Sequence, residues 1–224
     1  MSHERAIHFE GDRLRIPESA FDHDGFRAWV TSDEFPEGVH ASWIDGEVFV
    51  EMSPESIESH NKVKTELTSA FVAVARELGE TYADGCLFTN APAGVSTEPD
   101  LTFVTWATLQ SGRLRLNPRA NRDDEWIEIE GAPDVVVEVV SDSSVRKDLI
   151  RLRMAYRKAG IPEYWIVDAR GPDLRFEILV LEGDDYRPAA PAGAPQPSAV
   201  FAKTFSLSRR KNPVGRWTYD LTHV

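Results

Sequence analysis

Hydrophobic residues follow two different periods along this chain, and each period indicates a different kind of element. A spacing of three or four, typical of a helix with one buried face, occurs at Val63, Leu67, Ala70, Phe71, Val74 and Leu78. The same spacing returns at Val145, Leu149, Leu152, Tyr156 and Ala159. Ser53-Pro54 is a common helix start and Gly160 a common helix end. The pattern predicts helices over 54–79 and 144–159.

Runs of apolar and β-branched residues predict strands around these helices. The most continuous runs, typical of strands buried on both faces, are 101–106, 134–141 and 163–168. Alternating or shorter runs predict further strands at 6–16, 40–52 (a hairpin turning at Asp45-Gly46), 85–89, 125–131 and 175–183. The tail from 198 is predicted to add one or two edge strands. A short helix is predicted over 19–31, and loops over 107–123 and 188–197.

The order of these elements predicts the fold class. Between residues 54 and 168 the chain reads helix, three strands, helix, strand, the three strands being 85–89, 101–106 and 134–141. We therefore expect an α/β protein with a mixed central β-sheet flanked by helices. A single domain over 1–224 is expected, with three parts: an N-terminal arm and hairpin (1–53), the core (54–168) and a C-terminal strand extension (169–224).

Composition narrows the class of protein. The chain has 224 residues, 42% hydrophobic and 28% charged, which is enough for one sizeable core. No apolar run approaches the roughly 18 residues of a membrane span, and the first residues, MSHERAIHFEGDRLR, contain no apolar signal-peptide core. The single cysteine, Cys86, excludes an internal disulfide and a cysteine-based zinc site. We expect a soluble cytoplasmic protein with no membrane partner.

Charge is distributed unevenly along the chain. The formal net charge of -12 argues against broad attraction to nucleic acid. Segment 144–160 nevertheless carries six cations against one acid, Asp148. Two further basic clusters are Arg113, Arg115, Arg119, Arg122 and Arg209, Arg210, Lys211, Arg216. A solvated face is the commoner explanation for such runs, and contact with a nucleic-acid backbone is the alternative.

A buried carboxylate is the most informative candidate for chemistry. Glu138 interrupts the valine-rich run of strand 134–141, where an ionised acid is costly unless it is paired or holds a metal. Asp100 stands at the start of strand 101–106, so the two carboxylates would approach within about 5 Å if these strands are neighbours. Such a pair repels unless a cation lies between, and oxygen ligands favour Mg²⁺, Mn²⁺ or Ca²⁺ over zinc. A buried ion pair between Glu138 and an arginine remains the alternative.

Other polar residues near this strand are expected to be structural. Asp134 lies about 13 Å from Glu138 along an extended strand, too far to share an ion. The serines that follow the strand lack a base in any recognisable nucleophile motif. These serines are predicted to cap the helix that begins at 144; they are Ser141, Ser143 and Ser144.

Three segments in order, EPDLTFV, PDVVVEVVSDSSVRKD and AGIPEYWIVD, resemble the Uma-type family of restriction-endonuclease-like proteins, in the PD-(D/E)XK nuclease superfamily. WIDGEVFVEMSP and the following His60 are similar to the family's N-terminal pattern, and the resemblance covers roughly residues 25–182. It implies a restriction-endonuclease-like αβββαβ core and a Mg²⁺-dependent (or Mn²⁺-dependent) endonuclease that hydrolyses DNA. Nuclease folds of this kind commonly dimerise, which makes a homodimer an expectation.

The resemblance also implies roles for individual residues. Asp100 and Glu138 are the predicted metal ligands and catalytic acids. The superfamily lysine would stand at Val140, and many members of the family instead carry it four residues before the helix tyrosine, here at Leu152. Lys147 is the predicted catalytic replacement. Arg151 is the second choice, and a flexible lysine side chain makes such a shift plausible.

Additional site residues are predicted on the first helix and in the basic segments. Glu66 on the first helix is the candidate third acid, and His60 is a candidate ligand, although a lone histidine there is more often a core or capping group. Arg146, Arg151 and Arg153, with the loop 113–122, are predicted to contact the nucleic-acid backbone.

A second function stays open at this point. The displaced lysine and the negative charge also fit a catalytically inactive nuclease-fold protein that acts as a nucleic-acid or protein binding module. Ser42 replaces a family glutamate before the Asp-Gly turn, and Glu47 and Glu51 are its potential substitutes.

Overall fold

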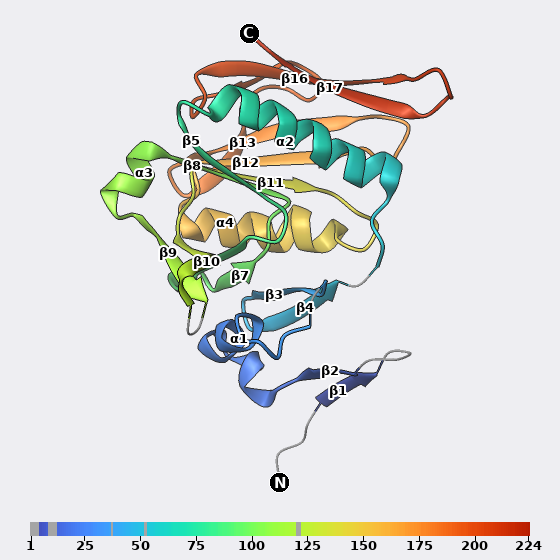
Figure 1. Ribbon diagram of the computed structural model, residues 1–224. Helices are drawn as coiled ribbons and strands as arrows, with labels where there is room; N and C mark the ends of the chain where they lie inside the picture. Colours follow the sequence, from blue (N-terminus) through green and yellow to red (C-terminus); the bar gives the residue numbers. More distant parts are fainter. Residues whose placement is uncertain (1–4, 9–12, 37, 52, 120–121) are drawn as a thin grey trace.

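The computed structural model describes residues 5–8, 13–36, 38–51, 53–119 and 122–224 (Figure 1). A six-stranded mixed sheet forms its centre. The strand order is β14 (Asp185–Pro188), β13 (Arg175–Glu182), β12 (Glu163–Asp168), β11 (Val135–Val139), β8 (Leu101–Thr105) and β5 (Gly79–Ala83). β11 and β12 run parallel, while the other neighbours run antiparallel. The predicted mixed sheet is confirmed.

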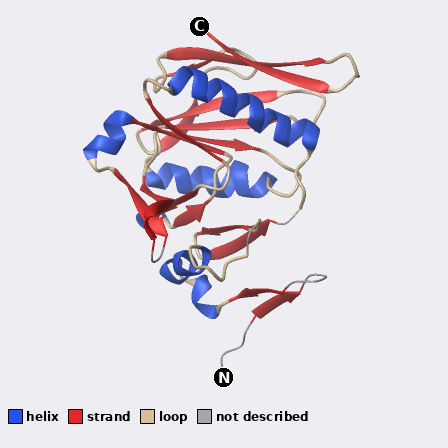
Figure 2. Cartoon of the chain, viewed as in Figure 1, coloured by secondary structure: helices blue, strands red, loops and turns tan. Residues whose placement is uncertain are grey.

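Two helices cover opposite faces of this sheet, as Figure 2 shows. The first is α2 (Lys62–Ala75), which follows the π-helical turn η2 (Ile57–Asn61). The second is α4 (Arg153–Ala159), which follows the π-helical segment η4 (Lys147–Leu152). The side chains of Leu67 and Phe71 pack on one face, and those of Leu152 and Tyr156 on the other.

A three-stranded sheet lies beyond α2 and completes the core on that side (Figure 1). It consists of β15 (Gln196–Ser198), β16 (Lys203–Lys211) and β17 (Trp217–His223), all antiparallel. Phe71 and Trp165 meet Phe201 and Phe205 edge to face, with ring centroids 4.9–5.8 Å apart. The predicted C-terminal edge strands are therefore a separate sheet that closes the core.

A second six-stranded sheet packs against α4. Its order is β4 (Glu47–Glu51), β3 (His40–Ile44), β7 (Val95–Thr97), β6 (Leu87–Asn90), β10 (Arg122–Gly131) and β9 (Leu114–Arg119). The short helices η1 (Glu18–Phe21), α1 (His23–Val30), η3 (Ala91–Ala93) and α3 (Trp106–Ser111) lie around it. The chain begins with the two-stranded sheet of β1 (Arg5–His8) and β2 (Arg13–Ile16). This sheet divides the strand predicted over 6–16, of which residues 9–12 lie outside the described structure.

Three predicted boundaries are wrong. Segment 85–89 was expected as the first core strand, but it contributes β6 to the second sheet, and β5 is the first core strand. A Cβ atom on Gly79 would lie 2.0 Å from the Val104 carbonyl oxygen, so glycine permits the close approach of β5 to β8. The loop predicted over 107–123 contains α3 and β9. The helix predicted from 54 begins at Ile57, because Ser56 accepts the Ser59 N–H as its cap.

Candidate active site

Asp100 and Glu138 come from neighbouring antiparallel strands, as expected. Leu101 of β8 pairs with Val137 of β11, and continuing this register places Asp100 opposite Glu138. The Val139 N–H donates a hydrogen bond of 2.6 Å to Asp100 Oδ2. Strand pairing therefore holds both carboxylates at the same end of the central sheet.

Glu138 points toward α4 because side chains alternate along β11. Val137 and Val139 join the core under α2, whereas Glu138 shares the opposite face with Val136. Glu138 is 3% exposed, and its Oε1 accepts a hydrogen bond of 2.6 Å from the Tyr156 hydroxyl. Among the described residues no arginine pairs with it, so the buried arginine ion pair considered as an alternative is not found there.

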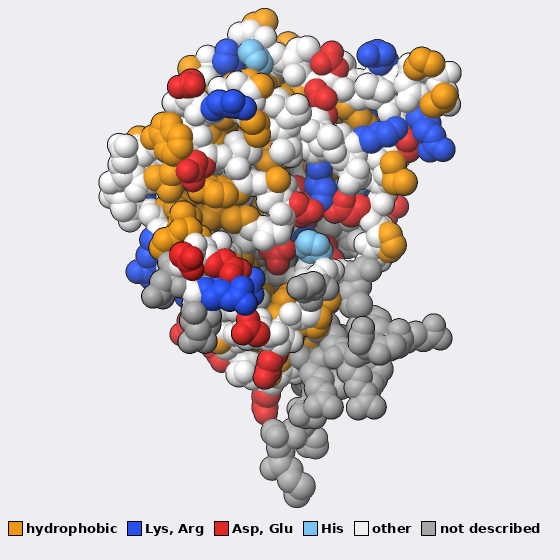
Figure 3. All heavy atoms as spheres, viewed as in Figure 1, with side chains coloured by type: hydrophobic (Ala, Val, Ile, Leu, Met, Phe, Trp, Pro, Cys, Tyr) orange, Lys and Arg blue, Asp and Glu red, His pale blue; other side chains and the backbone are white. Residues whose placement is uncertain are grey.

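A cavity of about 620 Å³ opens at this end of the sheet. Carboxylates dominate its lining, and they are Glu51, Glu55, Asp84, Glu98, Asp100, Glu138, Asp142 and Asp148. The basic side chains on its walls are His40, His60, Lys147 and Arg170. Figure 3 shows Asp and Glu side chains gathered beside a histidine near the middle of one face. The lining of the cavity therefore carries more negative than positive charge.

Burial and mutual repulsion raise the pKa values of three acids in the cavity. Burial is the largest cause that raises the pKa of Glu138 well above its usual range, and the charges of Asp148 and Asp100 add to it. Burial likewise raises the pKa of Asp148 to about 7 and that of Asp100 above its ordinary value, although His60 counteracts the shift at Asp100. A divalent cation bound between these close carboxylates would reduce their repulsion and favour their ionised forms.

Lys147 projects into this acidic cavity from the first turn of η4. Its Nζ donates a hydrogen bond of 2.8 Å to Glu51 Oε2 and lies 3.9 Å from Asp148 Oδ1. The side chain is 9% exposed, and Glu138 is the acid that most strongly raises the pKa of its ammonium group. The structure therefore brings Lys147 together with both predicted acids.

Asp148 is a cavity residue that the sequence argument missed. It is 1% exposed, and its Oδ2 accepts a hydrogen bond from the Ser144 hydroxyl. Its Oδ1 has no hydrogen-bond partner within the described part of the chain. The available signal was its position directly after Lys147 in an otherwise basic segment, where it was counted as a single opposing charge.

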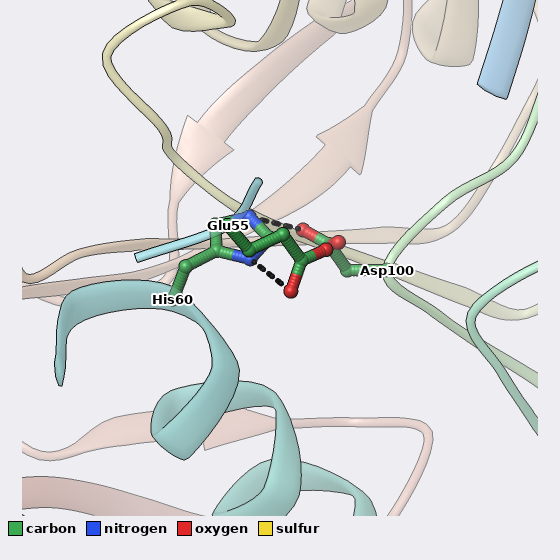
Figure 4. A group of neighbouring side chains, drawn as sticks. All are labelled: Glu55, His60 and Asp100. Carbon is green, nitrogen blue, oxygen red and sulfur yellow. Dashed lines mark ion pairs between the residues drawn. The ribbon is translucent and has the colours of Figure 1, made fainter. Parts of the chain in front are cut away.

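His60, Glu55 and Asp100 form a second group on the other side of Asp100 (Figure 4). His60 Nε2 lies 3.6 Å from Asp100 Oδ2, and His60 Nδ1 lies 3.2 Å from Glu55 Oε2 at an angle outside hydrogen-bond geometry. One ligand atom from each residue falls within 4.8 Å of the others, so this group could hold a metal ion. The buried Lys64 ammonium contacts the same cluster, since it donates a hydrogen bond to Glu55 Oε1 and lies 3.5 Å from Asp100 Oδ1. It also donates a hydrogen bond of 2.8 Å to the neighbouring Asp84 Oδ2.

Two of the remaining predicted residues point away from the cavity. Glu66 faces β17, where its Oε1 accepts the Leu221 N–H at 2.9 Å. Arg153 donates to the Tyr186 carbonyl of β14 at 3.0 Å. The structure therefore removes Glu66 as the third acid and Arg153 as a backbone contact next to the site, because both side chains are used in packing.

Arg146 and Arg151 line a smaller cavity of about 220 Å³ that adjoins the first. The two cavities share Glu51 and Lys147 on their walls. Arg151 also pairs with Glu47 at 2.8 Å. Both arginines stay within reach of anything that enters beside Lys147.

Residues predicted to be structural are found in structural roles. Asp134 Oδ2 accepts the Thr105 N–H at 2.7 Å and Oδ1 accepts the Thr108 hydroxyl at 2.8 Å, which ties β11 to the start of α3. Ser141 Oγ accepts the Ser144 N–H at 3.1 Å and so orders the turn before η4. The N-cap of η4 itself is Arg146, without a side-chain cap, so the prediction that these serines cap the helix is not confirmed.

Comparisons with known proteins agree with this architecture. A solved structure described as a putative nuclease belonging to DUF820 from Anabaena variabilis has 17% sequence identity and a TM-score of 0.57, covering 80% of this chain and 89% of that chain. At that identity the likeness concerns the fold. No curated protein matches the chain.

None of the described helices is long and apolar enough to cross a membrane. The family comparison matches residues 24–209 to Uma2, whose description is "Putative restriction endonuclease". The match spans most of the chain and includes every residue that lines the cavity. The chain therefore belongs to the Uma2 family of restriction-endonuclease-like proteins.

Proposed function

We propose that the protein is a metal-dependent endonuclease that hydrolyses DNA phosphodiester bonds. Membership of a restriction-endonuclease family supports a nuclease. The observation that carries the finer proposal is the convergence of Asp100 and Glu138 with Lys147 on one acidic cavity. Carboxylates on neighbouring strands beside a buried ammonium group provide both metal ligands and a fixed positive charge.

The residues present fit Mg²⁺ or Mn²⁺. The potential ligand atoms are mainly carboxylate oxygens, which hard divalent cations prefer. In addition, two buried polar atoms of the cavity, Asp148 Oδ1 and His60 Nδ1, lack hydrogen-bond partners among the described residues. Asp100 and Glu138 would hold the ion, with the His60 group beside them. Such an ion, when bound, lowers the pKa of water and stabilises negative charge on a phosphate.

The chain's own residues would position the reactants. Lys147 keeps its positive charge at neutral pH because Glu138, Asp148 and Glu51 raise its pKa. A fixed, largely buried ammonium group can stabilise charge that develops on a phosphate oxygen. Glu51 accepts the Lys147 hydrogen bond and thereby sets its direction.

DNA would enter across the adjoining cavities. Arg146 and Arg151 lie on the wall next to Lys147 and would contact phosphates on one side of the cleaved bond. Phosphate contacts of this kind fix the register of a duplex without reading its sequence. The proposal therefore assigns them to backbone binding.

A plasmid-relaxation assay with Mg²⁺ or Mn²⁺ tests the proposal. Wild-type protein should cleave supercoiled DNA, and Glu138→Gln should lower the rate by about 10²-fold or more. Glu163→Gln is the matched control, because Glu163 is a buried acid on the adjacent strand β12 that accepts hydrogen bonds from Trp165, Ser198 and Val200. Absence of cleavage by wild type, or equal cleavage by the Glu138 variant, would overturn the proposal.

A binding module without turnover is the second candidate. Val140 and Leu152, the two positions where the family lysine was expected, are fully buried apolar residues. If Lys147 does not replace that lysine, the cavity would bind a metal or a phosphate without hydrolysis. Calorimetric Mn²⁺ binding combined with no detectable cleavage of DNA would favour this candidate.

A further inference from the structure

The C-terminal hairpin carries a concentration of positive charge that the cavity does not account for. β16 and β17 form a long ribbon whose turn projects past the body of the protein (Figure 1). Residues 206–219 contain no acid and four cations, Arg209, Arg210, Lys211 and Arg216, in a chain of net charge -12. Figure 3 shows Lys and Arg side chains gathered at this end of the molecule.

The hairpin is attached to both rims of the cavity close to its turn, through Trp217 of β17 and Arg209 of β16. On one rim, the Trp217 N–H donates to Glu58 Oε2 at 2.8 Å and Lys62 Nζ donates to the Trp217 carbonyl at 2.9 Å. Glu58 belongs to η2, which lines the cavity. On the other rim, Arg209 donates to three carbonyls of the loop that holds the cavity residue Arg170, those of Ala169, Gly171 and Pro172. The ribbon is therefore fixed in place beside the opening of the cavity.

The turn of the hairpin is ordered by its own contacts. Asn212 Oδ1 accepts the N–H groups of Val214 and Arg216 at 3.1 and 2.9 Å. Lys211 Nζ lies 3.6 Å from the centroid of the Trp217 ring. A pre-ordered turn loses little conformational entropy when it binds a partner.

Three cations remain available at the turn. Arg210 pairs across the ribbon with Thr218, on the face opposite Trp217, and makes no hydrogen bond or ion pair with any described residue. Arg216 is 65% exposed and lies 3.6 Å from Glu58, and Lys211 is exposed. These positive groups face solvent, so they can bind a polyanion without first breaking a buried ion pair.

We propose that this hairpin is a second contact surface for duplex DNA, with Arg210, Lys211 and Arg216 on backbone phosphates. The inference rests on the proposed function, because it places the duplex across the cavity. A two-stranded ribbon matches the roughly 12 Å width of the DNA major groove. The hairpin would also offset the repulsion between DNA and the acidic remainder of the chain.

Duplex binding at several salt concentrations tests this surface, measured by fluorescence anisotropy in the Glu138→Gln background so that no cleavage interferes. Arg210→Glu/Lys211→Glu should weaken binding roughly tenfold per lost contact near 0.1 M salt, and lower the salt slope by about 0.9 per contact. The matched control is Arg187→Glu/Lys203→Glu, with the same residue types and charge change on β14 and at the other end of β16. The control should bind as the parent does.

The outcomes separate this inference from the nuclease proposal. Equal binding by hairpin and control variants, or no duplex binding by the parent, would overturn the hairpin surface. An effect confined to RNA would overturn its assignment to duplex DNA. Hairpin-dependent binding without plasmid cleavage by wild type would overturn the nuclease proposal alone. Arg210→Glu by itself is the variant least able to disturb folding. It should lower the salt slope by about half as much as the double variant does.

Discussion

The Tyr156 hydroxyl donates a hydrogen bond of 2.6 Å to Glu138 Oε1, and both side chains are buried between α4 and the central sheet. The contact joins a helix residue of the hydrophobic core to a proposed metal ligand. It favours the ionised form of Glu138, against the burial that favours the protonated form. The core of the protein thereby takes part in setting the charge of the cavity.

Replacing this tyrosine should weaken metal binding. In Tyr156→Phe the pKa of Glu138 rises further, so Mn²⁺ affinity at neutral pH should fall about tenfold, as measured by calorimetry. The free energy of unfolding should fall by about 1–3 kcal/mol. Tyr186→Phe is the control, because it removes a buried hydroxyl that donates to the Ile161 carbonyl outside the cavity. Unchanged Mn²⁺ affinity in Tyr156→Phe would contradict the prediction.

Lys147 should matter for cleavage and not for metal binding. Lys147→Met is expected to reduce plasmid cleavage by about 10²-fold, because Lys147 is the cation that acts on Glu138 among the residues that the structure describes. Its Mn²⁺ affinity should stay the same or increase, since a cation has left the cavity. Lys158→Met on the same helix, which removes a surface pair with Asp45, should cleave normally. A Lys147→Met protein that cleaves at the wild-type rate would rule out the lysine's role.

Stability should depend on pH through Asp148. Its folded-state pKa is raised to about 7, while the unfolded value is about 3.9, so the folded state binds more protons between these limits. The contribution of Asp148 to the free energy of unfolding therefore falls as pH rises from about 4 to about 7. Asp148→Asn should flatten this part of the profile in urea titrations. A profile unchanged by the substitution would show that Asp148 does not titrate in this window.

Divalent cations should stabilise the protein most where the carboxylates are ionised. A ligand present at about 100 times its Kd stabilises the folded state by about 2.7 kcal/mol. Protons compete with metal at Asp148, Asp100 and Glu138, whose pKa values are all raised. The increase in Tm on adding Mg²⁺ should thus be larger at pH 8 than at pH 5. An increase that is equal at both pH values, or that persists in Glu138→Gln, would place the ion elsewhere.

Arg27 should hold α1 to the second sheet. It makes two hydrogen bonds to Glu128, at 2.7 and 2.8 Å, and a third to Glu130 at 2.9 Å. Arg27→Met should lower the free energy of unfolding by about 3 kcal/mol, because it leaves the buried Glu128 charge unpaired. Arg175→Met is the control, since Arg175 is exposed and its pair with the half-buried Glu177 contributes about 1 kcal/mol or less.

The stability contributed by the Arg27, Glu128 and Glu130 cluster should be lost at low pH. The hydrogen bonds from Arg115 are the largest cause that lowers the pKa of Glu130 to about 2, and the charge of Arg27 adds to it. Burial raises the pKa of Glu128, but its hydrogen bonds with Arg27 and Asn117 outweigh that effect and lower it below its ordinary value. The stability they contribute is present above the unfolded pKa of about 4.3 and is lost as pH falls toward 2. Acid unfolding of Arg27→Met should show a weaker dependence on pH over that range. An equal dependence in both proteins would contradict the pairing.

The central features of the fold could be predicted because they depend on local patterns. The valine-rich β11 can only be a buried strand, and the helical period on either side of it indicates the two covering helices. Asp100 and Glu138 followed from the same reasoning, since a lone acid in such a strand needs a partner. The pairing of β8 with β11 confirms that the strands next to these two acids are neighbours.

Other features depend on contacts between distant segments and could not be predicted. β5 has the unremarkable sequence GETYA, and it is a strand because β8 offers it an edge that Gly79 can approach. Glu66 looked equivalent to other helix acids, but the position of β17 decides which way it faces. Asp148 and Lys64 are charged residues whose burial arises from the packing around them, which no periodicity reveals.

Four cavity residues stand in π-helical segments, Ser59 and His60 in η2 and Lys147 and Asp148 in η4. A π-helical turn closes its hydrogen bond one residue later than an α-helical turn, so it holds one additional residue. Deleting that additional residue between Lys147 and Tyr156 would let the segment become α-helical with little change in the direction of the lysine relative to the tyrosine. A segment of unchanged length that became α-helical would instead turn Lys147 by about 100° relative to Tyr156. The π-helical backbone thus decides where this scaffold places its cation while the hydrophobic face of α4 keeps its register.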